Sequence, residues 1–184
     1  MELETEIHPP LEANLQKCLK GDQKAYKAVY DAYSKAMFSI AMRMINNREE
    51  AEEILQDAFI AAFRNLRELQ DIKSFGAWLK KITINRSLDQ LKKRKLAFES
   101  VNDIEIADDD DEPETERPYT VEIIQAALLE LEDTYRVVFT LYLFENYSHS
   151  MISEKLGISE SNSKTILSRA KRKLIGILNQ TLLS

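Results

Sequence analysis

Hydroxyl side chains and long cations alternate between Ser159 and Leu174, a segment with five bases and one acid. At about 100° per residue, one face of a helix over this segment is polar and carries Ser161, Lys164, Thr165, Ser168, Lys171 and Arg172. The opposite face gathers Ser163, Ile166, Leu167, Ala170, Leu174 and Ile177. Hydroxyls and cations at this spacing suit the base edges and phosphates of duplex DNA. A solvated basic face on an ordinary helix is the alternative.

The residues just before this segment predict a tight turn. Gly157 follows Leu156 and can take the left-handed conformation that ends a helix. Ser159 can cap the helix that follows. Two short helices around a three-residue turn, the second of them basic, are typical of a helix-turn-helix that places a helix in the major groove.

A second candidate site lies in residues 75–95. The first half of this helix is apolar through Phe75, Trp78, Leu79 and Ile82, and the second half packs through Ile84, Leu88 and Leu91. Four polar residues therefore continue the line of Trp78 and Ile82, namely Asn85, Arg86, Asp89 and Lys93. A face that passes from aromatic to basic suits unstacked bases and their backbone. The alternative is a core Trp78 followed by a solvated basic end.

Apolar residues recur at helical spacing along most of the chain, which predicts an all-α protein. We expect helices over residues 11–20, 22–45, 48–67, 74–95, 119–131 and 134–143, and then the helix-turn-helix to about residue 183. Gly21 and the pair Asn46-Asn47 should interrupt the pattern, and Ser74 is a plausible N-cap.

Charge divides the chain. The net charge is −6, but residues 99–117 hold ten acids and one base and sum to −9, which leaves +3 elsewhere. This acidic stretch has no apolar period and contains Pro113. We therefore predict two helical domains, 11–96 and 119–184, joined by an acidic flexible linker over 97–118.

Several protein classes are not expected. Cys18 is the single cysteine, so no internal disulfide can form. Its place in a helical apolar pattern fits a buried, inert thiol. No apolar run approaches the roughly 18 residues of a membrane span, and no secretory leader is seen, so we expect a cytoplasmic protein without stable membrane insertion. His8 and His149 have no partners at a metal spacing, and there is no glycine-rich phosphate loop. We expect no enzyme activity, no metal and no cofactor, and a monomer.

Four stretches together resemble the sigma-70 family, specifically its small two-domain factors of the extracytoplasmic-function (ECF) type. Residues 48–59 are similar to the polymerase-docking helix of that family. Phe75-Gly76-Ala77-Trp78-Leu79, with Ile82, Asn85 and Asp89, resembles its promoter-melting helix. Residues 128–139 resemble the helix that precedes its helix-turn-helix, and residues 147–174 match the helix-turn-helix itself.

The resemblance implies a transcription initiation factor that binds core RNA polymerase, directs it to promoters and helps to open them. It implies polymerase docking for Glu53, Gln56, Asp57 and Phe59, although a solvated acidic face is the alternative for the polar three. Trp78 belongs to the promoter-melting helix, and Asn85 would hydrogen-bond a flipped base of the minus-ten element near residues 70–74. Phosphates would meet Lys80, Lys81, Arg86, Lys92, Lys93 and Arg94. The minus-thirty-five element would be read as duplex by Lys164, Thr165, Ser168, Arg169, Lys171 and Arg172.

The resemblance also implies an anti-sigma factor that covers both DNA- and polymerase-binding faces. An acidic linker would suit the positively charged path of nucleic acid through the polymerase, and a generic spacer explains it equally well. Ile166 stands where the family often has an arginine, and it lies near the apolar face. Two other functions stay open: a stand-alone regulator that binds duplex DNA as a dimer, and a degenerate sigma-like protein that only binds partners.

Overall fold

The computed structural model describes residues 9–94 and 119–181 of the chain. The chain divides into two compact units, Met1–Lys95 and Leu96–Ser184. Every regular element in the described ranges is helical, which confirms the predicted all-α fold. The predicted linker over 97–118 lies outside the described residues.

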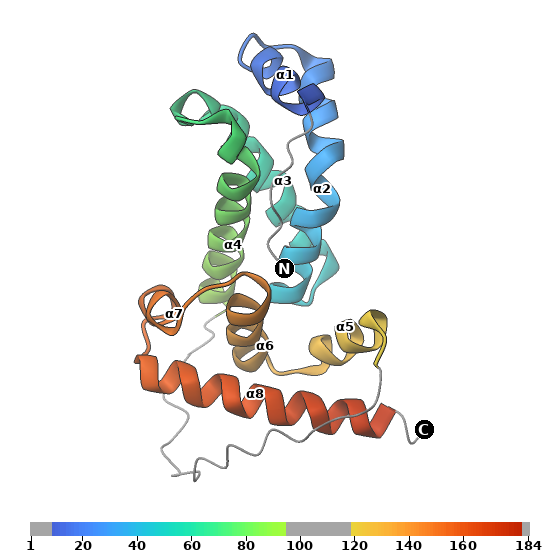
Figure 1. Ribbon diagram of the computed structural model, residues 1–184, viewed down its shortest axis with the longest axis vertical. Coiled ribbons are helices and arrows are strands. Elements are labelled where there is room, and N and C mark those ends of the chain that lie inside the picture. Colours follow the sequence, from blue (N-terminus) through green and yellow to red (C-terminus); the bar gives the residue numbers. More distant parts are fainter. Residues whose placement is uncertain (1–8, 95–118, 182–184) are drawn as a thin grey trace. The chain divides into compact units, whose positions relative to one another are not determined.

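The first unit contains four α-helices and two short 3-10 turns (Figure 1). The helices are α1 (Pro9–Cys18), α2 (Gln23–Ile45), α3 (Arg48–Arg64) and α4 (Phe75–Lys93), and η1 (Leu66–Glu68) and η2 (Ile72–Ser74) join α3 to α4. The long helices α2, α3 and α4 all pack against one another, and α1 packs on α2. Each of the three long helices buries one apolar face, because a helix of a small domain is stable in water only when that face is covered.

Side chains of the loops define where these helices begin. Asp22 accepts hydrogen bonds from the N–H groups of Lys24 and Ala25 and so caps α2. Asn46 ends α2 in the left-handed conformation, with φ 50°, and Asn47 caps α3 through the N–H of Glu50. The predicted break at Asn46-Asn47 is therefore made by two asparagines with different roles.

Two predicted helix ends in this unit and one predicted cap bond differ from the structure. The first helix begins at Pro9, two residues early, because proline is well tolerated in a first helical turn where no N–H bond is needed. The third α-helix ends at Arg64, and the side chain of Asn65 then bonds the carbonyl of Ala61. Ser74 makes no cap: its Oγ donates to the carbonyl of Asp71 at 2.6 Å.

A charged cluster joins the end of α4 to the start of α3. Arg94 forms an ion pair with Glu50 at 2.5 Å and donates to the carbonyl of Ile45 at 3.1 Å. Gln90 donates to the same carboxylate at 2.8 Å. The hydrogen bond from Arg94 is the main reason that the pKa of Glu50 lies below its ordinary value, and burial opposes it.

The second unit is built on α8 (Glu160–Thr181), which contacts α5 (Val121–Glu130), α6 (Asp133–Phe139) and α7 (His149–Leu156). The helix predicted over 134–143 changes type along its length. After Phe139 it becomes a π-helix, η3 (Thr140–Phe144), in which the N–H of Glu145 bonds the carbonyl of Thr140 at 3.1 Å.

Arg136 holds the turn between α5 and α6. Its side chain is 1% exposed, donates to the carbonyl of Leu131 at 2.6 Å and pairs with Asp133. A buried guanidinium is stable only when its donors are satisfied. Arg136 therefore links α6 to Leu131, the C-cap residue of α5.

We expect Arg136→Met to lower the free energy of unfolding of the second unit by about 3 kcal/mol, because the Leu131 carbonyl and the Asp133 carboxylate lose their partner. Lys173→Met is the matched control. Its pair with Glu132 is exposed at 46% and 70%, and Lys173 also lies 4.6 Å from the ring of Tyr135, so its loss should cost about 1 kcal/mol or less. Urea unfolding followed by circular dichroism measures both. Fluorescence of Trp78, the single tryptophan, reports the first unit and should not change; equal losses in the two variants would contradict the assignment.

A second prediction concerns Arg94→Ala. At pH 7 we expect it to lower the free energy of unfolding of the first unit by about 1–2 kcal/mol, because a charge-assisted hydrogen bond is lost. The folded-state pKa of Glu50 is depressed, so this contribution is present above the ordinary value of 4.5 and is lost as pH falls below it. The gap between the two proteins should therefore close between about pH 5 and pH 3.

Urea titrations followed by Trp78 fluorescence give the gap at each pH. Arg48→Ala is the control, because its ion pair with Glu52 is exposed at 77% and 47% and should contribute less than about 0.5 kcal/mol at any pH. A gap between wild type and Arg94→Ala that stays constant down to pH 3 would show that the Glu50 carboxylate is not its source.

Candidate functional site

The turn between α7 and α8 has the predicted geometry. Gly157 adopts φ 69°, and its N–H and that of Ile158 both bond the carbonyl of Ser153. The Oγ of Ser159 accepts from the N–H of Asn162 at 3.0 Å and caps α8. Both predictions about this turn are confirmed.

Packing divides α8 into two faces. Buried residues lie on one side: Ser163, Ile166, Leu167, Ala170, Leu174 and Leu178. The other side is exposed at Ser161, Lys164, Ser168 and Arg172, and half-buried at Thr165, Arg169 and Lys171. The apolar face ends on Leu178 and not on Ile177, which is half-buried. Ile166 packs in the core, as its position on the helical wheel predicts.

The α8 residues predicted to contact DNA lie outside the buried face, but they differ in how accessible their side chains are. Thr165 Oγ1 already donates to the carbonyl of Ser161, and the Nε of Arg169 is buried without a hydrogen-bond partner. Lys164, Ser168 and Arg172 are the most accessible members of the set. These three could reach phosphates and base edges without repacking the helix.

The outer face of α4 is continuous from Trp78 to Lys93. Trp78, Ile82 and Asn85 are half-buried, and Arg86, Asp89 and Lys93 are exposed. The Trp78 ring packs against the ring of Phe75, with 6.1 Å between their centroids. Phe75 is fully buried in the core, whereas the Trp78 ring remains partly accessible to solvent. This arrangement combines a stacking surface with amide and cationic groups, as a single-stranded nucleic acid requires.

The inner face of α4 carries two polar residues that sequence reasoning passed over. Thr83 and Ser87 are fully buried, and each hydroxyl donates to a carbonyl four residues earlier, Leu79 and Thr83 respectively. Because both hydroxyls are hydrogen-bonded within the helix, they need no partner elsewhere.

Phosphate contacts were predicted for five cations of α4 besides Arg94. Lys80 is half-buried, and Lys81, Arg86, Lys92 and Lys93 are exposed. Arg94 is instead held by Glu50.

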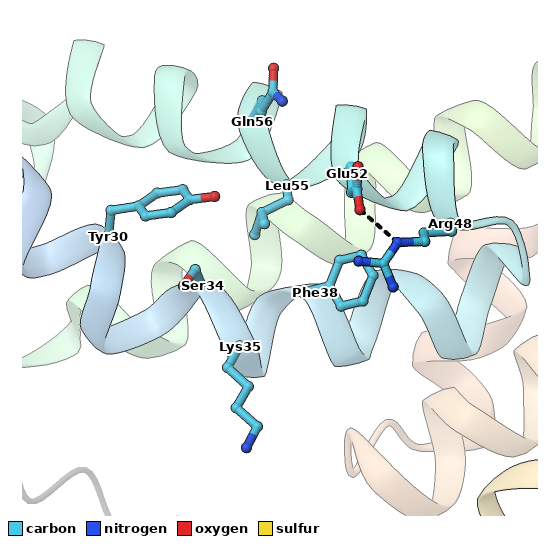
Figure 2. A pocket seen from close by; sticks show the side chains of 8 residues that line it. All are labelled: Tyr30, Ser34, Lys35, Phe38, Arg48, Glu52, Leu55 and Gln56. Carbon is cyan, nitrogen blue, oxygen red and sulfur yellow. Dashed lines mark ion pairs between the residues drawn. The ribbon is translucent and has the colours of Figure 1, made fainter.

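The acidic side of α3 borders a groove shared with α2 (Figure 2). Its volume is about 350 Å³, and it is lined by Tyr30, Ser34, Lys35, Phe38, Arg48, Glu52, Leu55 and Gln56. Arg48 pairs with Glu52 at 2.9 Å and lies 5.6 Å from the centroid of the Phe38 ring. Tyr30, Phe38 and Leu55 supply apolar surface among charged groups, a combination that suits a helical protein partner.

Among the residues predicted to dock a partner, Glu53, Gln56 and Asp57 are exposed on α3. Phe59 requires a correction. It is 3% exposed and packs against the rings of Tyr30 and Phe63, with centroids 4.7 and 5.7 Å away. Phe59 therefore supports α3 from inside the core and does not face a partner.

Sequence reasoning also missed the contribution of α2 to this groove. Ser34, Lys35 and Phe38 carry no motif of their own, and only the packing of α2 against α3 brings them beside Glu52 and Gln56. The apolar recurrence of Tyr30 with Val29 and Tyr33 indicated a packed face, and this was the one available signal.

Two further classes of site are absent from residues 9–94 and 119–181. No helix there combines the length and apolarity needed to cross a membrane. Within the same ranges, no three His, Cys, Asp or Glu side chains gather as they would around a metal ion. Burial is the main cause that raises the pKa of Cys18 to about 11, so this thiol is protonated and unreactive at neutral pH.

Comparison with known proteins places both units in one family. The profile for Sigma-70 region 2 matches residues 29–97, and that for Sigma-70, region 4 matches residues 121–174. The ECF RNA polymerase sigma factor SigW of Bacillus subtilis is 29% identical over 177 residues, which cover 89% of this chain and 94% of the relative. SigM of the same organism is 24% identical over 154 residues, 83% of this chain and 94% of the relative.

A solved structure supports the same fold. The sigma factor RpoE of Bartonella quintana, in its co-crystal structure with the anti-sigma factor NepR, aligns with a TM-score of 0.52 and 20% identity. The alignment covers 85% of this chain and 98% of that one. Regions 2 and 4 are the parts of sigma factors that mediate core polymerase binding and promoter recognition. The chain belongs to the sigma-70 family of RNA polymerase sigma factors, as a member of its ECF type.

Proposed function

We propose that the two units divide promoter-directed transcription initiation between them. The first docks on core RNA polymerase through α3 and captures the melted minus-ten element along α4. The second reads the minus-thirty-five element as duplex through α8, in the cytoplasm where the polymerase works. One observation carries this proposal. In each unit the candidate helices bury an apolar face and expose a polar or basic one, α3 and α4 in the first unit and α8 in the second.

For docking, Glu53, Gln56 and Asp57 are the proposed contacts. All three are exposed on α3, next to a groove whose floor is partly apolar. Acidic and amide groups around an apolar centre suit a partner helix with a basic rim, because charges at the rim steer association while the centre supplies burial.

For the melted strand, Trp78 would offer stacking surface and Asn85 would hydrogen-bond a flipped base. The nearby cations Lys80, Lys81, Arg86, Lys92 and Lys93 would neutralise phosphates. Arg94 could join them only by leaving Glu50, so we assign it to the stability of the unit.

For the duplex, Lys164, Ser168 and Arg172 are the principal proposed contacts, with Thr165, Arg169 and Lys171 beside them. A recognition helix with accessible hydroxyls and cations can contact both base edges and phosphates. The three cations Lys164, Lys171 and Arg172 should each add about one unit to the salt slope of binding.

We also propose an anti-sigma partner that covers apolar surface on both units. Large apolar side chains are exposed on each: Ile60 at 48% in the first, and Leu143, Phe144 and Met151 at 44%, 40% and 45% in the second. A structural relative, the sigma factor RpoE of Bartonella quintana, was crystallised with the anti-sigma factor NepR, which supports a partner of this class.

Docking is tested by gel filtration of the full chain with bacterial core RNA polymerase. We expect co-elution with wild type and its loss with Asp57→Lys, because the substitution reverses a charge on the exposed face of α3. Glu68→Lys makes the same charge change on η1, outside the groove, and should still co-elute. If Asp57→Lys co-elutes like wild type, the docking face is assigned incorrectly; wild type that binds duplex DNA unaided but never the polymerase would favour a stand-alone regulator.

Base capture is tested with Asn85→Ala in transcription from a promoter with a mismatch-opened bubble. Removing the amide should lower the yield by about 5- to 100-fold, because the flipped base loses its hydrogen-bond partner. Gln16→Ala removes an exposed amide from α1 and should leave the yield unchanged. Wild-type yield from Asn85→Ala on the opened template would show that Asn85 does not capture a base directly.

A further inference from the structure

A polar pair lies at the joint between the two helices of the helix-turn-helix. His149 is the first residue of α7, and Ser163 is fully buried in α8. The Nδ1 of His149 and the Oγ of Ser163 are 2.9 Å apart, which is hydrogen-bond distance. The His149 ring also stacks on Tyr142 of η3, with 4.5 Å between centroids and 26° between planes. Three elements therefore meet at one histidine.

Ser163 occupies a position at which packing alone would select an apolar residue. Its neighbours on the buried face are Ile166, Leu167 and Ala170. A hydroxyl buried among apolar groups is costly unless it is hydrogen-bonded, and His149 provides the bond. Such a bond is directional, and in a low-dielectric joint it is stronger than in water. Apolar contacts would hold α7 and α8 together over a range of angles, whereas this bond selects one.

The charged surroundings of His149 come from α8. Burial is the largest cause that lowers the pKa of His149 below its ordinary value, the cation of Lys164 lowers it further, and Glu160 partly opposes them. Tyr142 of η3 faces the ring from the other side. The ring is therefore neutral at pH 7 and above, and it lies in the field of a lysine that is itself a proposed phosphate contact.

We propose that His149 and Ser163 form a positioning pair that sets the angle of α8 for reading duplex DNA, and that binding of this DNA is coupled to protonation of His149. The inference rests on the proposed function of α8. A phosphate at Lys164 would offset the field of that lysine at His149, so DNA binding raises the histidine pKa and takes up protons. By linkage, the affinity for DNA rises as pH falls through this interval.

The stability of the free unit changes in the opposite direction. Because the folded-state pKa of His149 is lowered, its contribution is present above the ordinary value of 6.5 and is lost as pH falls below it. Lower pH therefore destabilises the DNA-free second unit but increases its affinity for DNA. A histidine with a purely structural role would lower the stability without raising the affinity.

The test uses the full chain with core polymerase and a 30-base-pair duplex selected from a random library by the wild-type complex. Dissociation constants are measured at constant salt from pH 6 to pH 8. Wild type should bind about 2- to 10-fold more tightly at pH 6 than at pH 8, since one unit of pKa change corresponds to a factor of ten. His149→Asn places an amide near the Nδ1 position and cannot titrate; it should bind within about twofold of wild type at pH 8 and show no pH dependence.

Ser163→Ala and His149→Phe each remove the bond, and the second keeps a ring against Tyr142. Each should weaken binding at pH 8 by about 3- to 10-fold, and the double variant should be no weaker than either single one, because both remove the same interaction. Ser153→Ala is the matched control: its hydroxyl bonds only within α7, to Ser150, and its loss should leave binding unchanged.

Nuclear magnetic resonance separates positioning from folding. The chain has two histidines, His8 and His149, so His149→Asn assigns the signals. The His149 titration should move to higher pH when the duplex is added. Wild-type binding by folded Ser163→Ala at pH 8, or full pH dependence in His149→Asn, would overturn the inference. Selection of no duplex sequence by the wild-type complex would contradict the proposed function itself.

Discussion

Burial of one side of α8 is the constraint on which the second unit depends. Helices α5, α6 and α7 share no common core without it, and each packs on the same seam. Ile166, Ala170 and Leu174 form the centre of that seam, and full burial of an Ile or Leu side chain contributes about 1.5–3 kcal/mol. Because the seam uses one side of α8, the hydroxyls and cations of the other side are left outward. The stability of the unit and the exposure of its candidate DNA face therefore have one cause.

The first unit follows the same logic with a different device. Three long helices bury one face each, and α4 does so with Thr83 and Ser87 among its apolar residues. These hydroxyls bond within their own helix, so the inner face accepts them without a partner. The opposite line, from Trp78 to Lys93, is then left at the surface. Arg94 closes the far end of α4 onto α3, so the candidate strand-binding helix and the candidate docking helix are parts of one packed body.

Each unit has one arginine with a structural role. Arg136 and Arg94 each donate to a backbone carbonyl as well as to a carboxylate, and each connects residues of different elements. On α8, Lys173 binds Glu132, and it is not among the cations proposed to contact DNA.

Local signals were sufficient for the helix-turn-helix. Gly157 and Ser159 act within three or four residues of themselves, through a left-handed backbone and a side-chain cap, so the sequence alone determined the turn. Helical spacing likewise predicted the inward residues of α8 from Ser163 to Leu174, but it was wrong at the end of the helix, where Leu178 and not Ile177 is buried. The all-α class and the family resemblance follow from the same short-range patterns.

Only the tertiary structure decided what depends on distant partners. Phe59 is buried because Tyr30 lies opposite it, Arg94 is engaged because Glu50 lies beside it, and the groove exists because α2 packs on α3. Ser163 is tolerated in a core because His149, fourteen residues earlier, supplies its hydrogen bond. Periodicity identifies a face, but it carries no information about what that face meets, since each such contact joins residues that no local rule relates.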